Sequence, residues 1–141
     1  MNATALVGVL AVVGLVGLDE SPQAPIDFRL QDHRGAWHTL AEAGDRDVVV
    51  LAFLGTECPL AGIYAPKLAD AARAFDGRGV AFFGVDANRQ EGPVAIGRFA
   101  EKHGLPFPML MDAGNILADR LGAERTPEVF VLDRSRTVVY R

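Results

Sequence analysis

Cysteine is nearly absent from this chain of 141 residues, which contains only Cys58. A single thiol excludes an intramolecular disulfide framework and a complete dithiol cycle within one chain. Histidine is also scarce. The sequence therefore predicts no metal site, because such a site needs several Cys, His or carboxylate ligands at suitable spacing. The three histidines are dispersed along the chain: His33, His38 and His103.

An excess of basic charge is missing as well. The chain has 14 Lys and Arg residues against 18 Asp and Glu residues, and its formal net charge is -4. Nucleic-acid binding needs clustered Lys and Arg side chains, so we predict no nucleic-acid partner. Neither GxxxxGK nor GxGxxG occurs, and we expect no nucleotide or other cofactor. With 50% hydrophobic and 23% charged residues, the composition is typical of one soluble globular domain.

The longest apolar run lies at the N-terminus, where Thr4 to Leu18 carry no charge. This length matches the apolar core of a signal peptide and falls short of the ~20 residues that span a bilayer comfortably. No Lys or Arg precedes the run and no clear cleavage site follows it, so an uncleaved anchor and a buried N-terminal element are the alternatives. We predict a signal peptide or short membrane anchor over 1–24, one domain over 25–141, and export to the periplasm or another extracytoplasmic space.

Beyond residue 24, strand patterns alternate with helix patterns. The run over 47–55 is almost continuously apolar and rich in Val, which is typical of a strand buried on both faces. Alternation of this kind predicts an α/β protein whose sheet carries helices on both faces, with a closing antiparallel hairpin at one edge. We predict a first hairpin within 24–45, strands at 47–55, 80–87, 107–112, 128–133 and 137–141, and helices at 59–76, 93–103 and 115–122.

Cys58 stands where the first buried strand is predicted to become a helix. At a helix N-cap a thiol faces unpaired backbone N–H groups and the positive end of the helix, and both favour the thiolate. Pro59 suits the first helical position because its missing N–H is not needed there, whereas the neighbouring Glu57 disfavours a second negative charge. A lone cysteine is more often a small buried hydrophobe, but this position favours a functional thiol.

The stretches FLGTECP and RTPEVFVLD, together with Pro66 inside the intervening helix, resemble the thioredoxin-like superfamily. The similar branch is that of the redoxins related to alkyl hydroperoxide reductase and thiol-specific antioxidant proteins, and the resemblance covers about Ala24 to the end. It implies a thioredoxin-like fold, with a central mixed β-sheet flanked by helices and an N-terminal β-hairpin. It also implies that Cys58 is the nucleophile, that Pro66 bends the helix, and that Thr126 and Pro127 form a cis-proline loop beside the thiol.

This chain departs from the family pattern in several places. Ala61 occupies the position of the second cysteine of thioredoxins, three residues after Cys58. Thr56 lies two residues before the cysteine, whereas the peroxiredoxin threonine lies three before it, and Arg125 does not coincide with the peroxiredoxin arginine. Related chains usually continue with a glycine and a helix after the final strand. This sequence stops at Arg141, so we expect either an exposed face of the sheet or a longer protein.

Two functions from different classes follow. The first is an antioxidant-type thiol oxidoreductase in which Cys58 attacks a peroxide or a disulfide and an external thiol completes the cycle. Thr56 and Arg125 are its predicted catalytic helpers, and Pro59, Thr126 and Pro127 are its predicted substrate-binding residues. The second is a catalytically degenerate module that binds a protein partner at the cis-proline loop, as Ala61 suggests.

Three other polar residues have simpler interpretations. Asp86 and Asn88 follow the second core strand, where turn formation accounts for both. His103 suits a helix C-terminus, where a positive charge is favoured.

Overall fold

The computed structural model describes residues 25–141. The predicted signal peptide or anchor, residues 1–24, lies outside this described part. Within residues 25–141, no helix is both long and apolar enough to cross a membrane. The strands are β1 (Arg29–Asp32), β2 (Trp37–Thr39), β3 (Val48–Phe53), β4 (Val80–Asp86), β5 (Met109–Met111), β6 (Glu128–Leu132) and β7 (Val138–Tyr140). The helices are the short 3-10 helix η1 (Leu40–Ala43), α1 (Pro59–Ala74), α2 (Pro93–Lys102) and α3 (Ile116–Leu121).

All the described strands form one mixed sheet in the order β2-β1-β5-β4-β3-β6-β7. The inner strand β3 pairs in parallel with β4 and antiparallel with β6. The β1–β2 hairpin closes one edge and the β6–β7 hairpin closes the other. The predicted α/β class and the mixed sheet with an N-terminal hairpin are confirmed. Because β3 and β4 run in parallel, their carboxyl ends meet at the same edge of the sheet.

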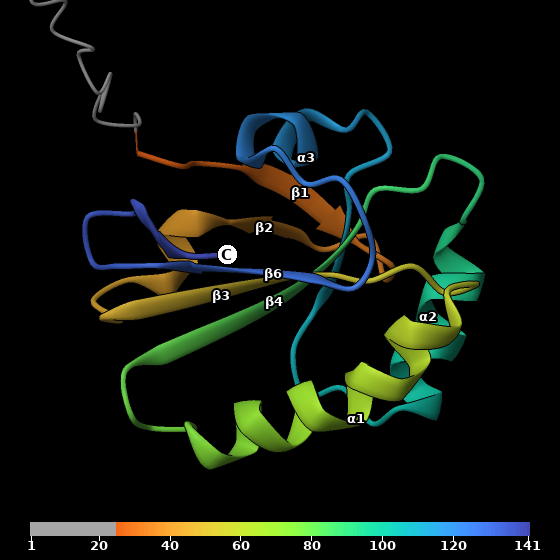
Figure 1. Ribbon diagram of the computed structural model, residues 1–141, viewed down its shortest axis with the longest axis horizontal. Helices are drawn as coiled ribbons and strands as arrows, with labels where there is room; N and C mark the ends of the chain where they lie inside the picture. Colours follow the sequence, from red (N-terminus) through yellow and green to blue (C-terminus); the bar gives the residue numbers. More distant parts are fainter. Residues whose placement is uncertain (1–24) are drawn as a thin grey trace, which may run out of the picture.

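Helices lie over both faces of the sheet (Figure 1), and an apolar cluster fills the space between the sheet and the helices on each face. The helix α3 packs over one face, and α1 and α2 pack over the other. Alternation along β3 divides its side chains between these layers. Leu51 and Phe53 join the cluster on the α3 side, whereas Ala52 and Leu54 join the cluster of α1 and α2. Burial on both faces explains why the β3 sequence is almost continuously apolar.

Helix α1 begins directly after β3 and a short turn. Cys58 is its N-cap residue and Pro59 its first residue, as predicted from the sequence. The helix continues through Pro66 and ends at Ala74, two residues earlier than predicted. Small side chains, Ala61, Ala65 and Ala69, form its buried face and allow α1 to approach the sheet closely. This packing fixes the place of Cys58 just beyond the carboxyl end of β3.

Candidate functional site

The only thiol of the chain lies at the amino end of α1, where two loops meet. Cys58 has extended backbone angles, φ -81° and ψ 115°, as an N-cap residue should. Its side chain is half-buried. The Sγ atom donates a hydrogen bond to the carbonyl oxygen of Thr126, 3.2 Å away. The Thr126–Pro127 peptide bond is cis, so the thiol lies directly against a cis-proline loop.

The pKa of the Cys58 thiol lies below its ordinary value. Hydrogen bonding by the Thr126 side chain is the largest cause, and the backbone N–H groups of Ala61 and Leu60 lower the pKa further. Burial and the negative charge of Glu91 act in the opposite direction. The helix amino end and the Thr126 loop therefore favour the thiolate, which is the nucleophilic form of cysteine.

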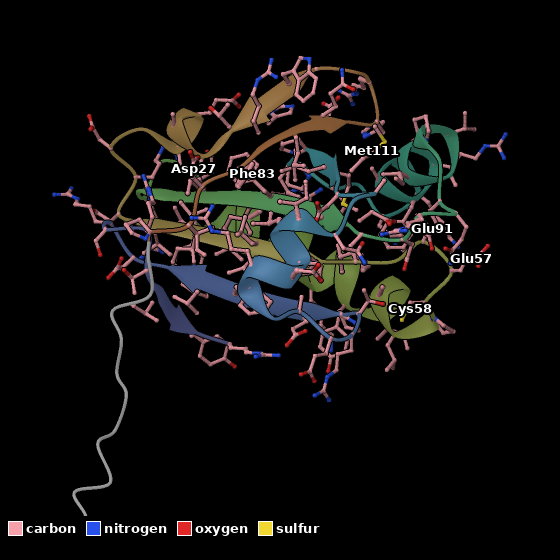
Figure 2. The ribbon with its side chains drawn as sticks, turned by 90° about the horizontal axis from the view of Figure 1, so that it is seen from above. Asp27, Glu57, Cys58, Phe83, Glu91 and Met111 are labelled. Carbon is pink, nitrogen blue, oxygen red and sulfur yellow. The ribbon has the colours of Figure 1, made fainter. Side chains whose placement is uncertain are left out.

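Glu91 holds the turn that precedes Cys58. Its Oε2 atom accepts the backbone N–H of Thr56 at 2.6 Å, and its Oε1 atom accepts that of Glu57 at 3.4 Å. The amide of Asn88 donates to the same Oε1 atom at 3.0 Å. Figure 2 shows Glu57, Cys58 and Glu91 grouped at one end of the molecule. The loop after β4 thus supplies a carboxylate to the backbone of the cysteine turn.

A second carboxyl group lies next to Glu91. Asp86, the last residue of β4, is only 2% exposed, and its Oδ1 atom accepts the backbone N–H of Asn88 at 2.9 Å. Burial and the hydrogen bond with Glu91 raise the pKa of Asp86 to about 8. Burial also raises the pKa of Glu91, but hydrogen bonds from Asp86 and Thr56 outweigh it and bring that pKa below its ordinary value. At neutral pH, Asp86 is the protonated partner and Glu91 the charged one.

Gly55 marks the point where three chain segments converge. A Cβ atom at this position would lie 2.7 Å from the Asn88 amide nitrogen and 3.3 Å from the Thr126 hydroxyl. It would also lie 3.7 Å from the Cβ atom of Cys58. A glycine here allows the end of β3, the loop after β4 and the cis-proline loop to approach one another.

A groove of about 580 Å³ opens beside Cys58 toward α2. The helix presents two cationic side chains to it, Arg98 and Lys102, and the ring of His103 lies at the helix end. Neither Arg98 nor Lys102 forms an ion pair with a residue in the described part of the chain. The remaining lining residues are Thr56, Glu57, Cys58, Pro59, Gly62, Ala95 and Phe99.

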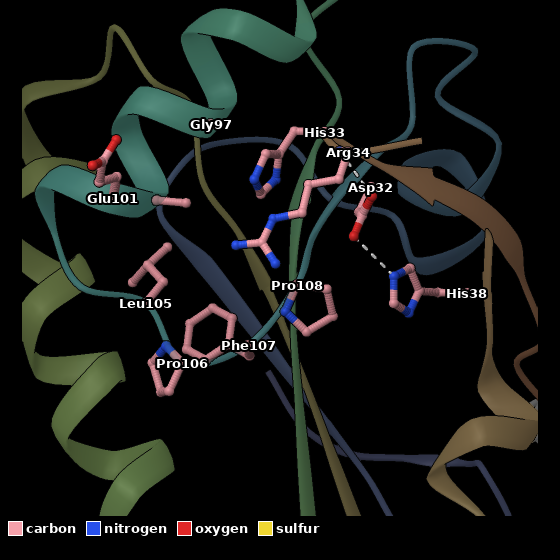
Figure 3. Close-up of a pocket in the computed structure, with 11 residues that line it drawn as sticks. Asp32, His33, Arg34, His38, Gly97, Glu101, Leu105, Pro106, Phe107 and Pro108 are labelled. Atoms are coloured by element: carbon pink, nitrogen blue, oxygen red, sulfur yellow. Dashed lines mark hydrogen bonds and ion pairs between the residues drawn. The ribbon is translucent and has the colours of Figure 1, made fainter. Parts of the chain in front are cut away.

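A larger cavity, of about 750 Å³, lies between the β1–β2 turn and the opposite side of α2 (Figure 3). His33 and Arg34 extend into it, and Phe107 forms part of its apolar wall. On its rim, Asp32 and His38 form an ion pair at 3.1 Å. Cys58 does not line this cavity. The larger volume of the cavity is therefore no reason to place the thiol chemistry there.

The structure brings most of the predicted site residues together. Thr56, Cys58 and Pro59 line one groove, and Thr126 contacts the thiol. Pro127 follows in the cis-proline loop. The Arg125 side chain is exposed and lies 3.9 Å from Glu124, outside the residues that line the groove. Its role as a helper stays a prediction.

Sequence reasoning assigned no role at the site to three residues of this region. Glu91 holds the cysteine turn, and His103 lines the groove as well as ending α2. Glu128 accepts the backbone N–H groups of Glu124 and Arg125 and thereby supports the cis-proline loop. For Glu91, a signal was present in the polar run that follows a buried strand at Asp86.

Comparison with known proteins agrees with this geometry. Thiol-disulfide oxidoreductase ResA of Halalkalibacterium halodurans is 27% identical over 122 residues, covering 86% of this chain and 68% of ResA. Chloroplastic peroxiredoxin Q of Populus jackii is 29% identical over 123 residues, covering 82% of this chain and 56% of that protein. The chain thus spans between about half and two thirds of the length of these curated relatives.

A solved structure has the same thioredoxin-like fold. It is a secreted Mycobacterium tuberculosis disulfide oxidoreductase homologous to E. coli DsbE, with a TM-score of 0.70 and 26% identity, and the match covers 86% of this chain and 84% of that one. The sequence pattern of the AhpC/TSA family matches residues 22–141. The chain therefore belongs to the AhpC/TSA family, a redoxin family of the thioredoxin-like superfamily.

Proposed function

We propose that this protein is a thiol-dependent oxidoreductase whose single redox group is Cys58. The observation that carries the proposal is the position of the thiol, which belongs to the N-cap residue of α1 and lies 3.2 Å from the Thr126 carbonyl oxygen. The helix amino end suits an activated nucleophile, because its N–H groups stabilise a thiolate, and the contact with Thr126 places the sulfur against the cis-proline loop. The names of the relatives, a thiol-disulfide oxidoreductase and a peroxiredoxin, support the same chemistry.

With a peroxide, the Cys58 thiolate attacks one oxygen of the O–O bond. A sulfur–oxygen bond forms and the O–O bond breaks. The leaving group, an alkoxide from an alkyl hydroperoxide or hydroxide from hydrogen peroxide, takes up a proton to give an alcohol or water. The sulfenic acid then condenses with an external thiol, which releases water and leaves a mixed disulfide. A second external thiol displaces Cys58 and carries away the disulfide product. An external thiol is required because the chain has no second cysteine.

With a disulfide substrate, the thiolate attacks one sulfur and expels the other as a thiolate. Thr126 and Pro127 are the proposed substrate-binding residues, together with Pro59 beside the thiol. Thr56 and Arg125 are the proposed helpers. Reactions of this kind suit an oxidising compartment, and we propose export directed by residues 1–24.

A second candidate is a binding module without turnover. Ala61 supports this candidate, because thioredoxins have their second cysteine at the corresponding position and this chain has an alanine there. In that case, an extended protein segment would lie along the Thr126–Pro127 loop, and the thiol would not be needed.

The test treats the full chain with hydrogen peroxide or oxidised glutathione and follows Cys58 by intact mass. Oxidoreductase function predicts rapid formation of sulfenic acid, trapped by dimedone, or of a mixed disulfide that a second thiol releases. Cys58→Ser abolishes both products, and Cys58 in the urea-unfolded chain gives the rate of an ordinary thiol. A folded protein that reacts no faster than the unfolded chain contradicts the proposal and favours the binding module.

A further inference from the structure

Two neighbouring carboxyl groups lie behind the cysteine turn, and the proposed reaction does not use them. We propose that Asp86 and Glu91 share one proton at neutral pH, and that this pair positions the Thr56–Cys58 turn and restrains ionisation of the Cys58 thiol. The inference rests on the proposed function, because it assigns a control to the same thiol. Asp86 and Glu91 are positioning residues in this scheme, since Glu91 acts on the sulfur through the turn and through its charge.

Glu91 is the charged member of the pair. Its two oxygens accept three N–H groups, from the backbones of Thr56 and Glu57 and from the Asn88 amide. Hydrogen bonds to an ionised acceptor are stronger than neutral ones. The 2.6 Å bond from the Thr56 N–H is the shortest of the three. It holds the charged carboxylate of Glu91 against the backbone two residues before the thiol.

Asp86 is the member that holds the proton. Its Oδ1 atom accepts the Asn88 N–H, whereas its buried Oδ2 atom has no donor among the described residues. The two carboxyl groups are joined through Asn88, whose backbone N–H donates to Asp86 and whose side-chain amide donates to Glu91, and both residues line the same small cavity. Two carboxylates cannot bond to each other without a proton, and burial makes two adjacent negative charges costly. The raised pKa of Asp86, about 8, agrees with this geometry.

On the side of the sheet, the charged residues near Asp86 and Glu91 form other contacts and do not neutralise either carboxyl group. On β1, Arg29 lines the same small cavity as Asp86 and Glu91, but its guanidinium stacks 3.9 Å from the centre of the Trp37 ring. After β5, the backbone N–H of Asp112 donates to the Asp86 carbonyl oxygen at 2.7 Å.

The other charged side chains near the pair either bond elsewhere or are exposed. The Asp112 carboxylate accepts N–H groups from Ile116 and Ala118 of α3. On the turn and the loop themselves, Glu57 and Arg89 are exposed. From α2, the cavity receives only the apolar side chains of Pro93 and Ile96. No cation in the described part of the chain forms an ion pair with either Asp86 or Glu91.

The pair acts on Cys58 in a predictable direction. The negative charge of Glu91 raises the thiol pKa and thus opposes the helix amino end. When Asp86 loses its proton, a second negative charge appears and the hydrogen bond within the pair is lost. Thiol and pair therefore titrate as coupled groups, so the thiol ionises over a broader pH range than one isolated group.

The first test measures the rate of Cys58 alkylation by iodoacetamide against pH in the full chain. Glu91→Gln removes a negative charge, so we expect a lower apparent thiol pKa than in the wild type. Asp86→Asn cannot ionise at position 86 but still offers an N–H group to Glu91. We therefore expect the alkylation rate of this variant to rise with pH over the narrower range of a single ionising group. Glu101→Gln, on the other side of α2, is the matched control and should leave the curve unchanged.

The second test observes the shared proton directly, by ¹³C NMR of the carboxyl carbons in a Cys58→Ser chain. One aspartate signal should titrate near pH 8, disappear in Asp86→Asn, and titrate at lower pH in Glu91→Gln. The inference is wrong if every aspartate titrates below pH 6, or if both variants keep the wild-type thiol curve. Neither measurement needs turnover, so an inactive protein with these titrations contradicts the proposed function alone.

Discussion

At the scale of the residue, Asp86 links the stability of the protein to pH. Its pKa in the folded state is about 8, above the ordinary aspartate value of 3.8. The folded protein therefore keeps a proton that the unfolded chain has released between these values. The stabilisation from Asp86 is complete below about pH 4 and is lost as the pH rises through about 8.

This linkage gives a prediction for Asp86→Asn. The amide side chain has no proton to lose, so the variant should gain stability relative to the wild type as the pH rises from 5 to 8. One unit of pKa difference corresponds to about 1.4 kcal/mol, and we expect a relative gain of at least about that size. Urea unfolding at the two pH values measures it. As a control, the exposed Asp76→Asn should differ from the wild type in free energy of unfolding by the same amount at both pH values. If Asp86→Asn also differed from the wild type by the same amount at both pH values, the prediction would be contradicted.

At the scale of the element, helix α2 gives the thiol groove its charge. Arg98 and Lys102 lie one turn apart on the face that lines the groove. Exposed charges of this kind attract anions over a range of about 8 Å at physiological ionic strength. A substrate that carries a carboxylate should therefore approach Cys58 faster than one that carries an ammonium group.

Charge reversal on α2 tests this expectation. In the double variant Arg98→Glu and Lys102→Glu, we expect the reaction of Cys58 with dithiodipropionate to slow several-fold relative to its reaction with cystamine. Added salt should reduce the difference between variant and wild type. Arg134→Glu is the control, because Arg134 pairs with Asp47 at the other end of β3. Equal effects on the anionic and the cationic disulfide would contradict a role for the α2 charges.

The elements themselves were largely predictable from the sequence. The apolar run of β3 and the periodic pattern of α1 are local signals, and their bounds differ from the structure by a few residues. Pro59 and Cys58 were placed correctly because helix capping is also local. The contact between Thr56 and Glu91 joins residues 35 apart in the chain. No periodicity encodes such a contact, which explains why Glu91 was missed.

At the scale of the whole molecule, Gly55 is the position at which distant segments depend on one another. Gly55→Ala forces the new methyl group against the Asn88 amide, which is held by Glu91. We expect a loss of about 1–3 kcal/mol in the free energy of unfolding, the usual effect of overpacking. We also expect a change in the thiol pKa, because Thr126 and Cys58 border the same space.

Denaturant unfolding and thiol alkylation measure the two effects of Gly55→Ala. Gly114→Ala is a suitable control, because a Cβ atom there meets only the Ile116 side chain at ordinary contact distances. If Gly55→Ala were as stable as the wild type and kept its thiol pKa, the three segments would not be as closely coupled as the structure indicates.

The hydrogen bond between Cys58 and Thr126 has a consequence for biosynthesis. The two residues are 68 positions apart, so a ribosome must complete most of the domain before this contact forms. Until then, the nascent chain carries an ordinary cysteine with neither the Thr126 loop nor a docked α1 to activate it. During synthesis the single thiol therefore reacts only as an ordinary cysteine does, and a rise above that reactivity can serve as a reporter of completed folding.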